Sequence, residues 1–170
     1  MTPRGPRRNR ERPVPDSAAA VVEMLHAAGE TLAVAESCTG GWLGRDITSV
    51  PGASASFWGG VIAYDNSAKR SLLAVSSGTL SDHGAVSEET AAEMAAGVAS
   101  LSEATWSVAV TGLAGPSGGT PDKPVGTVCI AIAGPVRLSR TFRLTGDREG
   151  VRAAAVARAL GLLLEAFEGR

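Results

Sequence analysis

Apolar side chains recur at helical spacing in three long segments, and each segment follows a residue that can cap a helix. The first begins at Asp16 or Ser17 and ends at Gly29; the other two follow Ser87 and Asp147. Two shorter helices are predicted, one running from the turn at 36–41 to about Thr48 and one over 66–73. The chain is therefore expected to contain at least five helices.

Short apolar runs separate these helices and predict five strands, at 31–35, 57–64, 106–111, 125–133 and 136–144. Gly134 and Pro135 turn the chain, so the last two strands should pair antiparallel. Gly59 and Gly60 lie inside the second run, which indicates that a backbone segment or a ligand packs closely there. Helices that alternate with buried strands and end in a hairpin predict an α/β fold, a three-layer α/β/α sandwich with a mixed sheet.

Composition narrows the class of protein. The chain has 170 residues, of which 44% are hydrophobic, enough for one core, and we expect a single domain over 16–170. A net charge of -1 argues against nucleic acid as the main partner. Apolar stretches are too short for a membrane span and no signal peptide is recognisable, so a cytoplasmic protein is expected. Cys38 and Cys129 lack the spacing of a disulfide framework or a structural metal site, so neither a metal nor a cofactor is expected.

Residues 1–15 differ from the rest of the chain. They hold five arginines and four prolines and almost nothing apolar, which predicts a disordered basic tail. Such a run could contact nucleic acid or anionic lipid, but a solvated chain end explains it as well. We assign it no function.

Three polar or glycine-rich loops each follow a predicted strand, where open α/β sheets bind their ligands. The turn 36–41 offers amides and a helix dipole to an anion or an oxyanion, or merely caps the helix. In the loop after Tyr64, Asn66 can cap a helix that carries Lys69, although a solvated surface lysine is the plainer interpretation and the tyrosine suits packing as well as catalysis. The loop 111–119 lacks the lysine of a P-loop; it is either a surface connection or functional.

Amide hydrolysis needs a nucleophile, a proton donor and a holder for the oxyanion. A Ser-His-Asp triad is poorly supported, because His26 lies in the first helix and His83 in an irregular stretch, outside all three loops. No cluster of carboxylates or histidines would supply a metal-bound water. The remaining base is a lysine with a lowered pKa, as in Ser-Lys hydrolases, and Lys69 is the candidate.

Over residues 16–168 the chain closely resembles the C-terminal-domain family of the competence-damage-inducible protein CinA. The resemblance implies an α/β/α fold and, for many members, deamidation of nicotinamide mononucleotide to nicotinic acid mononucleotide. It rests on a series of strings in one order: Ala35-Glu36-Ser37-Cys38-Thr39-Gly40-Gly41, Tyr64-Asp65-Asn66-Ser67-Ala68-Lys69, His83-Gly84-Ala85-Val86-Ser87, Thr111-Gly112-Leu113-Ala114-Gly115-Pro116, Lys123-Pro124-Val125-Gly126-Thr127-Val128 and Gly146-Asp147-Arg148.

The resemblance also implies residue roles. Ser37 would be the nucleophile, Lys69 its base and Tyr64 a proton relay or an orienting partner, with the Cys38 thiol as the rival nucleophile at the same turn. Arg148 would hold the substrate phosphate through its planar fork. The implied substrate-binding set is Glu36, Cys38, Thr39, Gly40, Gly41, Asn66, Thr111, Gly112, Ala114, Gly115 and Arg148.

Two features depart from the family pattern. Asp65 stands where a small polar residue such as serine is expected, and an inward carboxylate would keep Lys69 protonated. Members are often fused behind a larger N-terminal domain, for which this sequence has no room, so a stand-alone form is expected. The resemblance further implies a homo-oligomer that acts on a pyridine nucleotide. Two alternatives stay open: a catalytically inactive member that binds a nucleotide or a protein, and a Ser-Lys amidase for another small amide.

Overall fold

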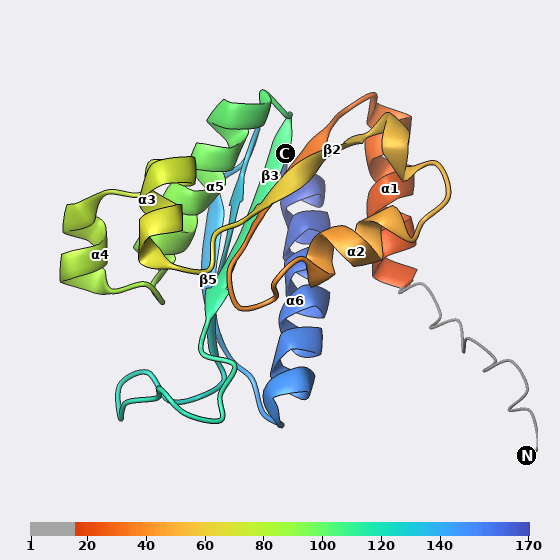
Figure 1. Ribbon diagram of the computed structural model, residues 1–170. Coiled ribbons are helices and arrows are strands. Elements are labelled where there is room, and N and C mark those ends of the chain that lie inside the picture. Colours follow the sequence, from red (N-terminus) through yellow and green to blue (C-terminus); the bar gives the residue numbers. More distant parts are fainter. Residues whose placement is uncertain (1–15) are drawn as a thin grey trace, which may run out of the picture.

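Three layers make up the part of the chain that the computed structural model describes, residues 16–170 (Figure 1). A five-stranded sheet lies between helices α1, α2 and α6 on one face and α3, α4 and α5 on the other. The α/β/α sandwich with a mixed sheet is confirmed, whereas the predicted tail at 1–15 lies outside the described residues. The elements are α1 (Asp16–Ala28), β1 (Leu32–Glu36), α2 (Trp42–Thr48), a 3₁₀ turn (Ala53–Ala55), β2 (Phe57–Ile62), α3 (Asn66–Leu73), α4 (Ser77–His83), α5 (Glu88–Ser102), β3 (Trp106–Gly112), β4 (Thr127–Ala133), β5 (Leu138–Arg143) and α6 (Arg148–Glu168).

The sheet has the strand order β2-β1-β3-β4-β5. Strand β1 runs parallel to both of its neighbours, β2 and β3, whereas β3–β4 and β4–β5 are antiparallel pairs. The hairpin predicted around Gly134 and Pro135 is therefore present. Because β1, β2 and β3 are parallel, the loops that follow all three emerge at the same edge of the sheet.

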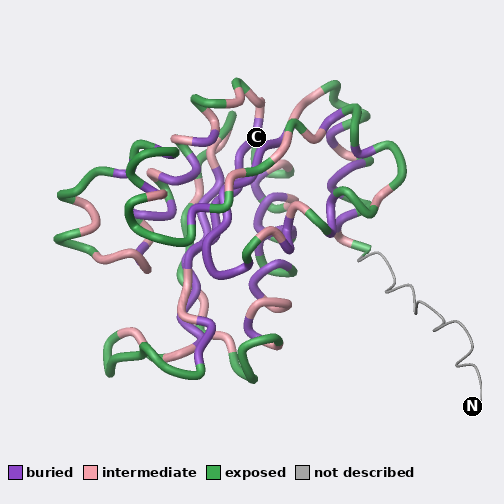
Figure 2. The backbone as a smooth tube through the Cα atoms, in the orientation of Figure 1, coloured by how far each residue is buried: buried purple, intermediate pink, exposed green. Residues whose placement is uncertain are grey.

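The core is divided by the sheet. Side chains alternate along a strand, so Val34 of β1 packs toward α1, α2 and α6 while Ala33 and Ala35 pack toward α5. Figure 2 shows the buried residues concentrated along the strands and the helix faces that cover them. The helix layers thus hold the strand ends, and the loops that leave them, in fixed positions.

Helix α3 is anchored to α5 through backbone contact. A Cβ atom on Gly97 would lie 2.0 Å from the carbonyl oxygen of Leu73, so the two helices approach here more closely than any other residue would allow. Helix α3 carries Lys69, whose place relative to the sheet therefore depends on this contact.

The pattern missed helix α4, and His83 ends that helix rather than lying in an irregular stretch. The helix has no buried residue and so leaves no apolar periodicity in the sequence. Its N-cap is Ser76, whose Oγ accepts a hydrogen bond from the Thr79 amide at 2.9 Å. The close packing predicted at the two glycines of β2 is present at Gly60, where a Cβ would lie 2.6 Å from the side-chain Cγ2 of Val34, and is absent at Gly59, where a Cβ would meet nothing within 4 Å.

Candidate active site

A cavity of about 220 Å³ opens where β1, β2 and β3 end, at the shared edge of the parallel strands. Residues from all three predicted loops line it, and we call it the Ser37 cavity. Its lining residues are Ser37, Cys38, Tyr64, Asn66, Lys69, Ala85, Val86, Thr111, Gly112, Leu113, Ala114 and Arg148. Of the residues singled out in the sequence, Glu36, Thr39, Gly40, Gly41 and Gly115 lie outside this lining.

Lys69 meets Ser37 at the base of the cavity. The lysine is only 1% exposed, and its Nζ lies 3.0 Å from Ser37 Oγ, 3.0 Å from the Ala63 carbonyl oxygen and 3.0 Å from the Tyr64 carbonyl oxygen. The Ser37 side chain is itself 6% exposed. Both groups are therefore withdrawn from bulk water and held in direct contact.

The protonation state of Lys69 decides what this contact can do. Burial lowers the pKa of Lys69 below its ordinary value of 10.5, because the charged form loses hydration. The two carbonyl oxygens can only accept hydrogen bonds, so a neutral amine can donate both of its N–H groups to them. Its lone pair then faces Ser37 Oγ, the arrangement that a base needs to take the hydroxyl proton.

Asp65 does not face Lys69. Its carboxylate accepts a 2.7 Å hydrogen bond from the Ser67 amide, which makes Asp65 the N-cap of α3, a role that the sequence assigned to Asn66. Interaction with the Ser67 side chain, and then this amide hydrogen bond, lower the pKa of the Asp65 carboxyl, which is fully exposed. Its charge raises the pKa of Lys69, but burial outweighs this effect. The lysine therefore keeps a lowered pKa beside this unusual carboxylate.

Glu36 is committed to the fold. It is 1% exposed, and its carboxylate accepts hydrogen bonds from the amides of Gly41 at 3.1 Å, Leu43 at 3.1 Å and Gly44 at 2.8 Å. It thus caps α2 from the preceding strand and is not placed to contact a substrate. The α2 amides that were expected to hold an anion are already occupied.

We call residues 36–41 the Ser37 turn. Beyond Glu36, backbone amides of this turn also donate hydrogen bonds within the protein. The Gly40 amide donates to the Ser37 carbonyl at 3.1 Å, and the Gly41 amide is held by Glu36. Thr39 is fully buried and does not line the cavity. Within residues 16–170 the Thr39 amide donates to no other residue, and the Cys38 amide contacts only its own thiol.

Cys38 shares the cavity with Ser37, but its thiol is a poor nucleophile there. It is 5% exposed, and burial raises its pKa to about 11. The thiolate is the reactive form of cysteine, and near neutral pH this group is almost entirely protonated. The advantage expected from the neighbouring helix N-terminus is absent, because Glu36 occupies those amides.

For the amide hydrolysis that the sequence resemblance implies, Cys38→Ala is expected to leave the rate within about threefold of the wild type, because a protonated thiol takes no part in nucleophilic attack. The measurement is the steady-state rate of ammonia release, with the melting temperature recorded as a check on folding. An inactive but folded Cys38→Ala, together with an active Ser37→Ala, would assign the reaction to the thiol.

The third loop closes one wall of the cavity. The Thr111 hydroxyl donates to the Ala85 carbonyl at 2.7 Å and so is used to join two lining segments. Gly112 permits the close approach of its neighbours, because a Cβ there would lie 2.8 Å from Val128 Cγ2 and 3.1 Å from Cys38 Sγ. Ala114 is 5% exposed and completes this wall.

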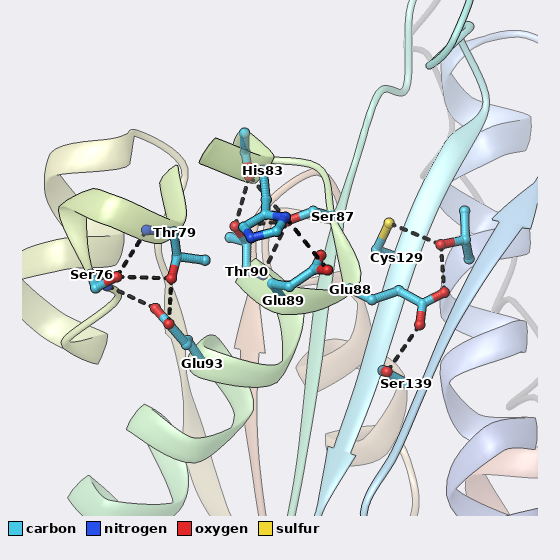
Figure 3. A network of polar contacts seen from close by, with 12 residues as sticks. Ser76, Thr79, His83, Ser87, Glu88, Glu89, Thr90, Glu93, Cys129 and Ser139 are labelled. Atoms are coloured by element: carbon cyan, nitrogen blue, oxygen red, sulfur yellow. Dashed lines mark hydrogen bonds and ion pairs between the residues drawn. The ribbon is translucent and has the colours of Figure 1, made fainter. Parts of the chain in front are cut away.

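Ala85, Val86 and Leu113 line the cavity and were not among the predicted site residues. Ala85 and Val86 belong to the short link between α4 and α5, which polar contacts hold in place (Figure 3). Thr90 Oγ1 donates to the Gly84 carbonyl at 2.7 Å, and the Thr90 amide donates to Ser87 Oγ at 3.1 Å. These residues supply shape rather than reactive groups, so their signals in the sequence were the quoted string 83–87 for Ala85 and Val86 and the string 111–116 for Leu113.

Two arginines of α6 fasten the loops around the cavity. Arg148 donates to the Gly115 carbonyl at 2.6 Å and to the Tyr64 hydroxyl at 3.0 Å, so the exposed phenol faces the guanidinium. Arg152, one helical turn later, donates to the carbonyls of Cys38 at 3.0 Å and Thr39 at 2.9 Å. Sequence reasoning missed Arg152, although its spacing of four from Arg148 places both on one helix face.

Within 16–170, no three histidine, cysteine, aspartate or glutamate side chains gather closely enough to hold a metal ion. None of the described helices combines the length and the apolar character that crossing a membrane requires.

Comparison with known proteins identifies relatives of the whole described region. The family model of the CinA C-terminal domain matches residues 15–167. A CinA-like protein of Synechococcus sp. is 53% identical over 152 residues, which cover 87% of this chain and 36% of that protein. One of Anaeromyxobacter sp. is 51% identical over 146 residues, covering 85% of this chain and 36% of that protein. The chain thus spans about a third of the length of these relatives.

Solved structures show the same fold. A competence-damaged protein (CinA) superfamily protein of Klebsiella pneumoniae superposes with a TM-score of 0.89 at 36% identity, covering 94% of this chain and 100% of that one. The competence/damage-inducible protein CihA of Agrobacterium tumefaciens gives a TM-score of 0.86 at 39% identity, covering 89% and 93% respectively.

Proposed function

The chain belongs to the CinA C-terminal domain family, and on that premise we propose that it hydrolyses nicotinamide mononucleotide to nicotinic acid mononucleotide and ammonia. One observation carries the proposal: the buried amine of Lys69 lies 3.0 Å from the hydroxyl of Ser37 in a cavity at the ends of parallel strands. Among the described residues no histidine lines that cavity, so a lysine base fits the chemistry better than a histidine base.

The first half of the reaction forms an acyl-enzyme. Ser37 Oγ attacks the carboxamide carbon while its proton passes to the neutral amine of Lys69. The resulting tetrahedral intermediate carries a negative oxygen. When it collapses, the carbon–nitrogen bond breaks, Lys69 returns the proton to the leaving nitrogen, and ammonia departs from an ester on Ser37.

The second half restores the enzyme. A water molecule gives a proton to Lys69 and attacks the ester carbon, forming a second tetrahedral intermediate. This intermediate expels Ser37 Oγ, which takes the proton back from Lys69, and the product leaves as a carboxylic acid that loses its proton to water. Each step uses Lys69 once as an acceptor and once as a donor, so no second titrating side chain is required.

The negative oxygen of both intermediates needs hydrogen-bond donors. The amides of Gly40 and Gly41 are bonded within the Ser37 turn and to Glu36, so they are not available. The amides of Cys38 and Thr39 immediately follow the nucleophile and donate to no other residue among those described. We assign the oxyanion to these two amides.

In this proposal Arg148 binds the substrate phosphate. The side chain is exposed at the edge of the cavity, and its contacts with Gly115 and Tyr64 hold the guanidinium beside the opening. A guanidinium binds phosphate through two parallel hydrogen bonds, which a lysine cannot reproduce. A pyridine nucleotide with its carboxamide at Ser37 would place its phosphate toward this side chain.

Arg148→Ala is expected to lower the kcat/KM for nicotinamide mononucleotide by about 10- to 100-fold, because a charge-assisted hydrogen bond contributes about 1.5–3 kcal/mol. The rate on nicotinamide riboside, which has no phosphate, should hardly change, so the two substrates should converge. Arg148→Lys should recover part of the difference. Kinetics on both substrates provide the measurement.

Tyr64→Phe is the matched control for this variant, because it removes the hydroxyl that Arg148 contacts and leaves the arginine in place. It should preserve the preference for the phosphorylated substrate. If Arg148→Ala slows both substrates equally, the arginine supports the loops and does not bind the phosphate.

The substrate class is tested by ammonia release from a panel of amides: nicotinamide mononucleotide, its riboside, free nicotinamide and unrelated small carboxamides. Selective hydrolysis of the mononucleotide supports the proposal. Preference for another amide would identify a Ser-Lys amidase of different specificity, and binding of the nucleotide without hydrolysis would identify a non-catalytic binding module. A cytoplasmic location and a homo-oligomeric state, both predicted from the sequence, complete the proposal.

A further inference from the structure

Helix α6 contacts the Ser37 turn through the side chain of Arg152. Arg152 Nε donates to the Cys38 carbonyl at 3.0 Å, and Nη2 donates to the Thr39 carbonyl at 2.9 Å. The guanidinium also lies over the Trp42 ring, 5.3 Å from its centroid, which fixes its plane. One arginine therefore holds two consecutive carbonyls of this turn.

Holding these carbonyls determines where the amides point. A trans peptide is planar, with its N–H directed opposite to its C=O, and the single cis bond among the described residues lies elsewhere, at Gly115–Pro116. Arg152 draws the Cys38 carbonyl toward α6, so the Thr39 amide of the same peptide must point away from α6. The preceding peptide is fixed too, since the Ser37 carbonyl accepts from the Gly40 amide at 3.1 Å.

The positive charge of Arg152 also favours the Thr39 amide as a hydrogen-bond donor. A cation on a carbonyl oxygen polarises the peptide and makes the N–H at its other end a stronger donor. The guanidinium is close enough to influence the turn electrostatically, because it lowers the pKa of the Cys38 thiol against the larger effect of burial.

We propose that Arg152 is a positioning residue for hydrolysis: it orients and polarises the peptide between Cys38 and Thr39 so that the Thr39 amide stabilises the oxyanion formed beside Ser37. The inference rests on the proposed function, in which Ser37 is the nucleophile. Arg152 touches neither substrate nor reacting atoms and acts through the turn. Its partner on the same helix face, Arg148, binds the phosphate, so the two arginines have separable effects.

The test uses a fluorophosphonate probe, which reacts covalently with activated serines and resembles no pyridine nucleotide. Wild-type protein should be labelled at Ser37. Arg152→Met, which keeps an aliphatic stem over Trp42 but removes all donors, should be labelled at least about tenfold more slowly, because small displacements of catalytic groups have effects of this size. The loss should appear in the maximal labelling rate and not in the apparent affinity for the probe.

Two further variants separate positioning from general structure. Arg152→Lys retains the charge but can reach the carbonyls only as a point donor, so an intermediate labelling rate is expected. Arg158→Met is the matched control: Arg158 lies on the same helix over the Phe142 ring, 5.5 Å from its centroid, and should be labelled like the wild type. In Arg152→Ala, added guanidinium ion should restore labelling and sodium chloride at equal ionic strength should not.

The outcomes distinguish the two levels of the argument. Wild-type protein that is not labelled at Ser37 contradicts the proposed function itself. Labelling of folded Arg152→Met or Arg152→Lys at the wild-type rate contradicts the role of Arg152 and leaves Ser37 as the nucleophile. If Arg152→Met fails to fold, labelling of the Arg152→Lys protein and its melting temperature decide the question.

Discussion

Ser37→Ala is expected to reduce ammonia release from nicotinamide mononucleotide by about 10⁴-fold or more, because it removes the atom that forms the acyl-enzyme. The fold should survive. Among residues 16–170 the Ser37 hydroxyl has one partner, Lys69 Nζ at 3.0 Å, and the loss of one hydrogen bond of this kind costs about 1 kcal/mol. Nucleotide binding, measured by calorimetry, should persist in the inactive variant.

Ser56→Ala provides the matched control. Ser56 is also a buried serine, 2% exposed, but its hydroxyl has no hydrogen-bond partner among the described residues. Its removal should leave activity unchanged and stability equal or slightly higher, because an unsatisfied buried hydroxyl is unfavourable. Retained turnover in Ser37→Ala would eliminate the proposed nucleophile.

The fold could be predicted from sequence wherever a buried face leaves a pattern. The apolar stripes of α1, α5 and α6 gave elements that the structure confirms, as did the runs of β1 and β3. Helix α4 was missed because none of its residues is buried. Periodicity therefore reports burial, and a helix that covers nothing stays invisible to it.

Side-chain direction limits what sequence reasoning could say about the site. The three loops do meet, because strand order and parallel pairing follow from the alternation of helices and strands. Glu36, by contrast, was grouped with the substrate-binding residues because it adjoins Ser37, yet it points into the fold and caps α2. Adjacent strand residues face opposite sides, and which side holds the ligand depends on the finished packing.

Contacts between distant segments were the hardest to foresee. Arg152 lies 113 positions from Thr39 in the chain, and its role depends on how α6 crosses the sheet beside the Ser37 turn. Asp65 shows the same limit at short range, since the sequence left its orientation open and the structure directs it to the amide of Ser67. In both cases a polar side chain selects one of several backbone partners that tertiary packing brings within reach.

Lys69→Met is expected to lower the rate of hydrolysis by about 10²- to 10⁴-fold with little change in nucleotide affinity, because the variant lacks the base but fills the same buried space. Arg70→Met is the matched control, since this neighbouring cation of α3 is exposed and lines no part of the Ser37 cavity. Loss of activity in both variants would attribute the effect to helix α3 and not to the Lys69 amine.

The pH dependence gives the second test of Lys69, for catalysis and for stability. Burial lowers the pKa of Lys69, so below that folded-state pKa the base is protonated, and kcat/KM should rise with pH as it loses its proton. Asp65→Ser should move this rise only slightly, toward lower pH, because the Asp65 charge raises the pKa of Lys69 but burial is the larger effect. Between the lowered folded pKa and the ordinary value of 10.5, the unfolded chain binds more protons, so stability should increase with pH across that window. Lys69→Met removes this contribution, and denaturant unfolding at several pH values should show the difference; an unchanged slope would mean that Lys69 is not buried as a neutral amine.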